Sequence, residues 1–187
     1  MYLFLIILIV AVVIILRWMN TVKIRSGGAE DSFSVTPLEN LSTAHRAEFI
    51  DMFTEENTAG LGKRWSKEKA AQLFTYADAD AKARKRTNWH YALVDAGHVV
   101  GYISITPTGL DNYPGSQLTW MVPLKQRGHG YTARGLSKLP RRGMGKIYSF
   151  VSIGNEQSNA VARKTCKLLH QANVYGSLHN VYLFKSR

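Results

Sequence analysis

The chain has 187 residues, of which 45% are hydrophobic and 20% are charged, and its formal net charge is +11. This composition excludes a disordered chain, and 15 Gly with 5 Pro exclude a collagen-like or low-complexity sequence. The single cysteine, Cys166, can form neither an internal disulfide nor a thiolate metal cage, so no metal site is expected. The length fits one compact core of about 150 residues and an additional segment.

The positive charge lies mainly in the second half of the chain. Residues 97–187 contain twelve Lys or Arg against two Asp or Glu, whereas residues 27–96 contain nine against eleven. One explanation of this distribution is an excess of solvated surface charge. The other is that the basic half binds an anionic ligand, nucleic acid or an acidic membrane surface.

The N-terminal segment is apolar without interruption from Tyr2 to Leu16, and Trp18 and Met19 extend it to about the length that a helix needs to cross a membrane. A cleaved signal peptide is the alternative. No Lys or Arg precedes the apolar run and no small-residue cleavage pattern follows it, which favours a retained anchor. We therefore expect residues 1–19 to form a single transmembrane helix.

The charges that flank this segment predict its orientation. Arg17, Lys23 and Arg25 follow the apolar run, and positively charged flanks remain on the cytoplasmic side. We expect the polar, Gly-containing residues 20–32 to form a flexible tether. We expect a single-pass membrane protein whose C-terminal domain, residues 33–187, lies in the cytoplasm.

In the first half of this domain, periodicity predicts a strand at 33–38, a helix from about 42 to 56, and a second helix that Ser66 caps. The segments 90–94 and 99–106, joined by a Gly-containing turn, predict a hairpin. A further strand is expected at 117–122, where a proline ends it.

In the second half, a Gly-rich turn precedes a short helix that cannot continue intact past Pro140. A strand at 146–153, a helix from about 157 to 172 and a last strand at 180–184 follow. Cys166 falls within this last helix and is interpreted as structural. The resulting order is one strand, two helices, three strands, and then helix, strand, helix and strand, which predicts a mixed α/β fold.

The segment Trp120–Thr132 (WMVPLKQRGHGYT) carries the most chemical information. A strand stops at a proline, and a Gly-x-Gly turn then opens a helix. Such a turn directs successive backbone N–H groups at one point, where a phosphate can bind. Gly128 and Gly130 permit positive φ, and Lys125 and Arg127 add positive charge. The pattern is neither a Walker loop, which needs Gly-Lys-Ser/Thr, nor a dinucleotide fingerprint, which needs a third Gly.

The pattern resembles the acyl-CoA signature of the GNAT superfamily of N-acyltransferases, Arg/Gln-x-x-Gly-x-Gly/Ala, at Arg127–Thr132, where Thr132 replaces the last Gly or Ala. The Val-x-Pro that often ends the preceding strand is similar to Met121-Val122-Pro123 here. A common Asn-x-x-Ser/Ala at the start of the next helix matches Asn155–Ser158. Simple helix capping by Asn155 is the alternative explanation of this second match.

The resemblance implies a GNAT-like three-layer α/β fold whose mixed sheet splays between its fourth and fifth strands. Acyl-CoA, here acetyl-CoA, would lie in the opening, and its acyl group would pass directly to an amine acceptor that the sequence does not identify. The residues that the resemblance assigns to coenzyme binding are Met121, Val122, Arg127, Gly128, His129, Gly130, Tyr131, Thr132, Asn155 and Ser158.

The catalytic residues are less clearly indicated. Many GNAT proteins protonate the leaving thiolate with a Tyr seven residues after the Asn, but this position is Ala162 here. Ser158 is the candidate replacement and Tyr175 a more distant one. Asp111 and His90 are the candidate bases, although Asp111 also suits a turn and His90 an ordinary strand position.

The resulting hypothesis is a membrane-anchored N-acetyltransferase. One alternative is a GNAT-like enzyme that modifies nucleic-acid bases or tRNA, for which the basic second half would bind phosphates. Another is a non-catalytic CoA-binding module, which Ala162 and Thr132 favour. Trp120 and Tyr131 are expected to be packing residues, and His129 to be an exposed side chain in the loop.

Overall fold

The computed structural model describes residues 32–59, 65–83, 85–140 and 144–185. The chain divides into two units at residue 32, and the second, Phe33–Arg187, is the domain that contains the described helices and strands. The predicted anchor (1–19) and nearly all of the predicted tether (20–32) lie outside the described residues. Within the described ranges, no helix is both long and apolar enough to cross a membrane.

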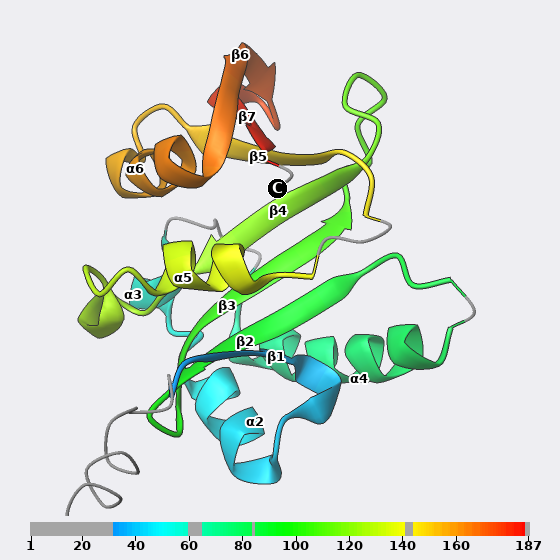
Figure 1. The fold of residues 1–187 in the computed structure, drawn as a ribbon, viewed down its shortest axis with the longest axis vertical. Helices are drawn as coiled ribbons and strands as arrows, with labels where there is room; N and C mark the ends of the chain where they lie inside the picture. The colour runs from blue at the N-terminus through cyan, green and yellow to red at the C-terminus, as the bar shows by residue number, and fades with distance from the viewer. Residues whose placement is uncertain (1–31, 60–64, 84, 141–143, 186–187) are drawn as a thin grey trace, which may run out of the picture. The chain divides into compact units, whose positions relative to one another are not determined.

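The domain is built on one seven-stranded mixed sheet with the order β1-β2-β3-β4-β5-β7-β6 (Figure 1). All neighbouring strands are antiparallel except β4 and β5, which are parallel. The strands are β1 (Ser34–Pro37), β2 (Trp89–Asp95), β3 (His98–Pro107), β4 (Ser116–Met121), β5 (Ile147–Ser152), β6 (Cys166–Val174) and β7 (Ser177–Phe184).

Local capping fixes where several helices begin. The hydroxyls of Ser42 and Ser66 accept the N–H groups of His45 and Lys69, so each serine satisfies a free donor of the first turn. The described helices are η1 (Leu38–Asn40), α2 (Thr43–Asp51), α3 (Glu55–Thr58), α4 (Lys67–Lys82), η3 (Leu124–Gln126), α5 (Tyr131–Lys138) and α6 (Glu156–Thr165).

The helices cover the sheet on two faces, which gives the predicted three layers. On one face, Leu136 of α5 and Ala162 of α6 join a core with Leu93, Ile103 and Leu118 of the sheet. On the other face, Phe49 of α2 and Phe74 of α4 form a second core with three sheet residues, Ala92, Tyr102 and Met121. These sheet residues alternate along their strands with those of the first core. Alternate residues of each strand therefore belong to opposite faces.

The two central strands touch only where they begin. Ser116 pairs with Ile147 and Gln117 with Tyr148, and beyond these two pairs β4 and β5 separate (Figure 1). The N–H of Ser116 donates to the carbonyl of Lys146 at 2.9 Å. Gly115, at φ +145°, allows this approach because a Cβ there would collide with the same carbonyl. The predicted mixed sheet and its splay between the fourth and fifth strands are thus confirmed.

The predicted helix from 42 to 56 was too long. It ends at Asp51, and the separate short helix α3 begins after Thr54, whose hydroxyl accepts the N–H of Asn57. The interruption buries Met52 and Phe53 in the second core. The helical spacing of these apolar residues therefore reflects burial and not one continuous helix.

The predicted helix from 157 to 172 was also wrong in its second half. α6 ends at Thr165, and Cys166 is the buried first residue of strand β6, which pairs with β7 along its length. A two-residue turn joins β6 to β7, with φ +53° at Tyr175 and +81° at Gly176, as in a type I′ hairpin. Pairing with β7 overrides the helical propensity of the Lys- and Leu-rich segment.

Candidate active site

The loop between β4 and α5 has the predicted strand, turn and helix order. Gly128 and Gly130 have φ of +86° and +74°, and a Cβ on either would meet no atom within 4 Å. Gly130 is the N-cap of α5 and supplies no side chain to the cap. The two glycines leave open space in front of the helix N-terminus.

The main-chain N–H groups of this loop are available for a ligand. The N–H of Arg127 donates to Leu124, and the N–H of Arg134 donates to Gly130. Between them, no acceptor within the described part of the chain receives the N–H groups of residues 128–133. Free N–H groups at the positive end of a helix form a site for an anion such as a diphosphate.

Two side chains of the loop pack against the domain, and a third is exposed. Thr132, which departs from the family signature, is 6% exposed and therefore packs inward. Tyr131 donates to Asp95 at 3.1 Å and stacks on Phe33, which confirms its role in packing. His129 is exposed, as expected, with its ring 5.6 Å from that of Tyr131.

Arg127 connects the two sides of the strand separation. Its Nε donates to the carbonyl of Val122 at the end of β4, and one Nη donates to Gln157 of α6 at 3.1 Å. The guanidinium thus lies between the loop that follows β4 and the helix that follows β5. A permanent positive charge therefore bridges the end of the β4 segment and the first turn of α6.

Asn155 has the capping role that the sequence left as an alternative. Its side-chain oxygen accepts the N–H of Ser158 at 3.0 Å, and Ser158 is half-buried in the first turn of α6. The neighbouring Asn159, which no sequence motif singled out, is 1% exposed. Its amide donates to the carbonyl of Ser152 and accepts from Tyr182, and so fixes α6 to β5 and β7.

On the opposite face of the sheet, Tyr175 spans the start of the strand separation. From the β6–β7 turn its hydroxyl donates to Gln117 Oε1 at 2.7 Å. Its ring meets Phe150 of β5 edge-on, with centroids 6.2 Å apart. Gln117 is the last residue of β4 that pairs with β5, so the Tyr175 hydroxyl lies where the two strands diverge.

A second tyrosine lies next to this position. Tyr113, in the loop before β4, packs edge-on against Tyr148 and Phe150, and its hydroxyl is 2.9 Å from His170 Nε2 on β6. The sequence offered no sign of this group because residue 170 was assigned to a helix. Gly176, which takes the positive φ of the turn, is the one local feature of the sequence that is compatible with a hairpin here.

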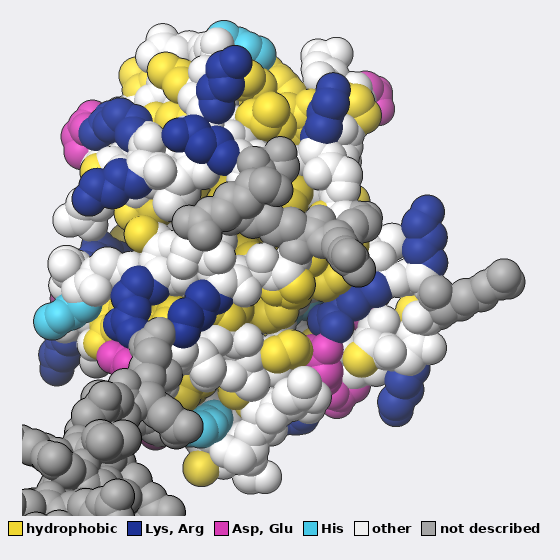
Figure 2. Space-filling view, viewed as in Figure 1, with side chains coloured by type: hydrophobic (Ala, Val, Ile, Leu, Met, Phe, Trp, Pro, Cys, Tyr) yellow, Lys and Arg dark blue, Asp and Glu magenta, His cyan; other side chains and the backbone are white. Residues whose placement is uncertain are grey.

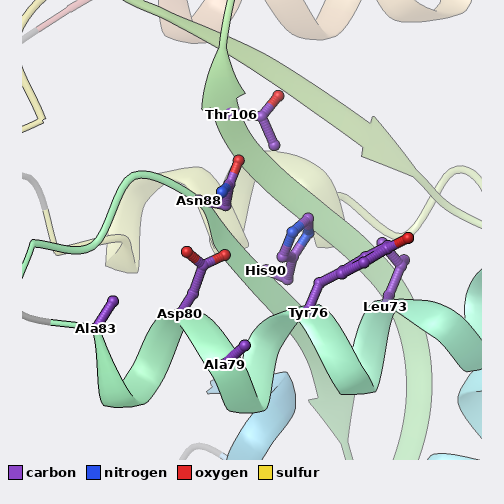
Figure 3. Close-up of a pocket in the computed structure, with 8 residues that line it drawn as sticks. All are labelled: Leu73, Tyr76, Ala79, Asp80, Ala83, Asn88, His90 and Thr106. Carbon is purple, nitrogen blue, oxygen red and sulfur yellow. The ribbon is translucent and has the colours of Figure 1, made fainter.

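His90 lies in a cavity of about 570 Å³ between α4 and the sheet (Figure 3). Its Nδ1 is 2.7 Å from the hydroxyl of Tyr102, and burial lowers its pKa to about 4. In the sheet, His90 of β2 is paired with Ser104 of β3, and Ser104 is paired with Thr119 of β4. His90 is therefore neutral at pH 7 and two strands away from the edge of β4 that faces the separation.

The three candidate catalytic residues lie in different places. Asp111 is exposed in the loop between β3 and β4, His90 is buried below α4, and Ser158 is at the start of α6. Gln117 and Thr119 lie on the face of β4 that Tyr175 contacts, and neither side chain can act as a strong base. The catalytic roles proposed for these three residues stay predictions.

Positive charge covers the face formed by α5 and α6. Figure 2 shows Lys and Arg side chains over this region with few acidic ones among them. The two helices carry Arg134, Lys138, Arg163 and Lys164. Part of the excess charge of the second half is thus placed on the helices that begin beside the strand separation.

The fold is that of GNAT-family acetyltransferases. A putative GNAT-family acetyltransferase from Bordetella pertussis matches with a TM-score of 0.64 at 16% identity, over 83% of this chain and 96% of that one. A ribosomal-protein-S5-alanine acetyltransferase from Vibrio fischeri matches with a TM-score of 0.64 at 13% identity, over 83% and 94%. A ribosomal L7/L12 α-N-protein acetyltransferase in complex with coenzyme A matches with a TM-score of 0.59 at 16% identity, over 84% and 94%.

No protein-family profile matches the sequence. No curated protein has a similar sequence. The similarity to the solved structures, all below 25% identity, therefore establishes the fold.

The pKa of His90 makes stability depend on pH. Its folded-state pKa of about 4 is below the ordinary value of 6.5, so this contribution is complete above pH 6.5 and is lost as pH falls toward 4. The shift corresponds to roughly 3 kcal/mol of unfolding free energy. Urea unfolding at pH 7 and pH 4 should give a smaller pH-dependent loss for His90→Gln than for the wild type.

His129→Gln, the same substitution at an exposed position, provides the comparison variant. Equal losses between pH 7 and pH 4 in the wild type and His90→Gln would mean that His90 is not held neutral by burial.

Proposed function

We propose that this protein is an acetyl-CoA-dependent N-acetyltransferase. The observation that carries the proposal is the row of N–H groups at residues 128–133 that have no acceptor among the described residues, in the loop that follows the first of two strands that separate after two residue pairs. A diphosphate needs several donors at one point, and an extended pantetheine arm needs the unpaired edge of a strand. The loop and the separated strands provide both features next to each other.

The residues present fit the coenzyme. The N–H groups of the loop and the positive end of α5 would hold the diphosphate, with Arg127 adding charge. Beyond Gln117, the edge of β4 that faces β5 has no paired strand in the described chain and can bond the amides of the arm. Bound there, acetyl-CoA would supply a thioester activated toward attack by an amine.

We assign the donation of a proton to the leaving thiolate to Tyr175. As the amine forms its new C–N bond and the C–S bond breaks, the sulfur gains a negative charge that a nearby O–H can neutralise. The Tyr175 hydroxyl lies at Gln117, where the strands diverge, whereas Ala162 has no donor. Ser158 is an alternative donor from the other side of the separation. The proton lost by the amine would pass to water at the open site, and water would then reprotonate Tyr175.

Membrane anchoring is a separate part of the proposal and depends on the sequence of residues 1–19. If this segment anchors the chain, the full-length protein should sediment with membranes after carbonate washing and require detergent for extraction. Replacing three central residues of the apolar run, Ile7, Val10 and Val13, with Lys should release it, because charge at the bilayer centre is costly. Wild-type protein that is recovered without detergent would contradict the anchor.

Gly130→Asp tests coenzyme binding. A carboxylate in the open space before α5 would repel the diphosphate, and a non-glycine residue at φ +74° adds strain. We expect acetyl-CoA affinity, measured by calorimetry with the full chain, to fall at least tenfold. Gly109→Asp is the matched control, because Gly109 also has positive φ, at +63°, with no atom within 4 Å of its Cβ.

Equal binding by wild type, Gly130→Asp and Gly109→Asp would contradict the proposed loop site. If both variants lose binding equally, backbone strain is responsible and not the position of the charge.

Tyr175→Phe tests the proton donor. This substitution keeps the ring against Phe150 and removes only the hydroxyl. We expect kcat to fall by about 10²-fold while acetyl-CoA affinity stays unchanged, a size typical of a lost general acid. Ser158→Ala is the comparison, and thiol release with an amine panel is the measurement. A larger loss of kcat in Ser158→Ala than in Tyr175→Phe would transfer the role to Ser158.

A further inference from the structure

A cavity lies on the sheet face that carries Tyr175, under the C-terminal half of α4 (Figure 3). Asp80 projects from α4 toward the side of the cavity where Asn88 and His90 lie. The lining residues are Leu73, Tyr76, Ala79, Asp80, Ala83, Asn88, His90 and Thr106. Asp80 carries the only carboxylate among them, and none of them is a Lys or Arg.

The Asp80 carboxylate has no partner within the described part of the chain, as neither an ion pair nor a hydrogen bond reaches it. Asp78, two residues earlier on the same helix, pairs instead with Arg46 at 3.6 Å. Arg86 is held by the carboxylate of Glu39, which neutralises its charge. A half-buried carboxylate among described lining residues that include no Lys or Arg favours a cationic ligand.

His90 does not compete with such a ligand. Burial keeps its ring neutral at pH 7, and its Nδ1 is occupied by Tyr102. Tyr76, which is 57% exposed, also lines the cavity and supplies an aromatic ring there. The cavity therefore combines one negative charge, polar groups and an aromatic ring, which is a suitable environment for an ammonium group.

The sheet register connects this cavity to the strand separation. Thr106, which lines the cavity, pairs with Gln117, which bonds Tyr175 where β4 and β5 diverge. His90, Ser104 and Thr119 form a parallel row across the same three strands. Two strand spacings separate β2 from β4, a distance of about 10 Å.

We propose that the acceptor is a linear diamine or polyamine: Asp80 binds its distal ammonium group in this cavity while the reacting nitrogen lies at the strand separation. This inference rests on the proposed acetyltransferase function and adds the substrate class. The acceptor is positioned by charge at one end, so an alkylamine of equal length without the second nitrogen is a poorer substrate.

Steady-state kinetics with the full chain, acetyl-CoA, an eight-carbon α,ω-diamine and octylamine test the proposal. We expect the wild type to show a KM at least tenfold lower for the diamine than for octylamine. Asp80→Asn should remove this preference, by raising KM for the diamine about tenfold with kcat and the KM for octylamine unchanged. Asp78→Asn, on the same helix, is the matched control and should behave as the wild type does.

Equal KM values for the two amines in the wild type, or a diamine preference that survives in Asp80→Asn, would overturn the proposal. Calorimetric titration of the diamine without acetyl-CoA separates this failure from failure of the proposed function. Binding of the diamine that depends on Asp80, without any acetyl transfer, would support the site and contradict the enzyme. Acetyl transfer to both amines without dependence on Asp80 would support the enzyme and contradict the site.

Discussion

The arrangement of this domain depends on the short contact between β4 and β5. Two residue pairs hold the strands together at their N-terminal ends, and Gly115 brings the chain against the carbonyl of Lys146 there. Past this point, within the described ranges, each strand is paired only on its outer side, β4 with β3 and β5 with β7. An unpaired edge inside a sheet leaves N–H and C=O groups that need another partner. The features of the proposed site are all arranged around this opening.

Separate side-chain contacts on each face of the sheet hold its two halves in position. Asn159 ties α6 to β5 and β7, while Arg127 reaches from the loop after β4 to Gln157. Tyr175 makes a corresponding link on the other face, through Gln117. Ala162, where many GNAT proteins carry a catalytic tyrosine, is completely buried in the core, so a large side chain would not fit there. In the mechanism proposed above, the hydroxyl comes from a hairpin instead of from α6.

The parts of the site that the sequence predicted are those that a few consecutive residues determine. The proline that follows β4, the two glycines and the helix after them define the loop without help from distant residues. By contrast, Lys167, Leu168 and Gln171 favour a helix, and only pairing with β7 makes them a strand. The Tyr175–Gln117 bond joins residues 58 positions apart, and the cavity of Asp80 and His90 joins a helix to two strands. Such contacts depend on the register of the sheet, which local patterns do not encode.

The hairpin that carries Tyr175 also restricts how its length can vary. Successive side chains of a strand point to opposite faces, so one added or removed residue in β6 or β7 would shift the pairing register by one position. The hydroxyl would then be directed away from Gln117. One added residue on each strand would keep the β6–β7 pairing but move the turn by one position and onto the opposite face. The contact therefore fixes the length of the hairpin itself, which makes the number of residues between α6 and this turn a criterion for recognising homologous sequences that use the same tyrosine.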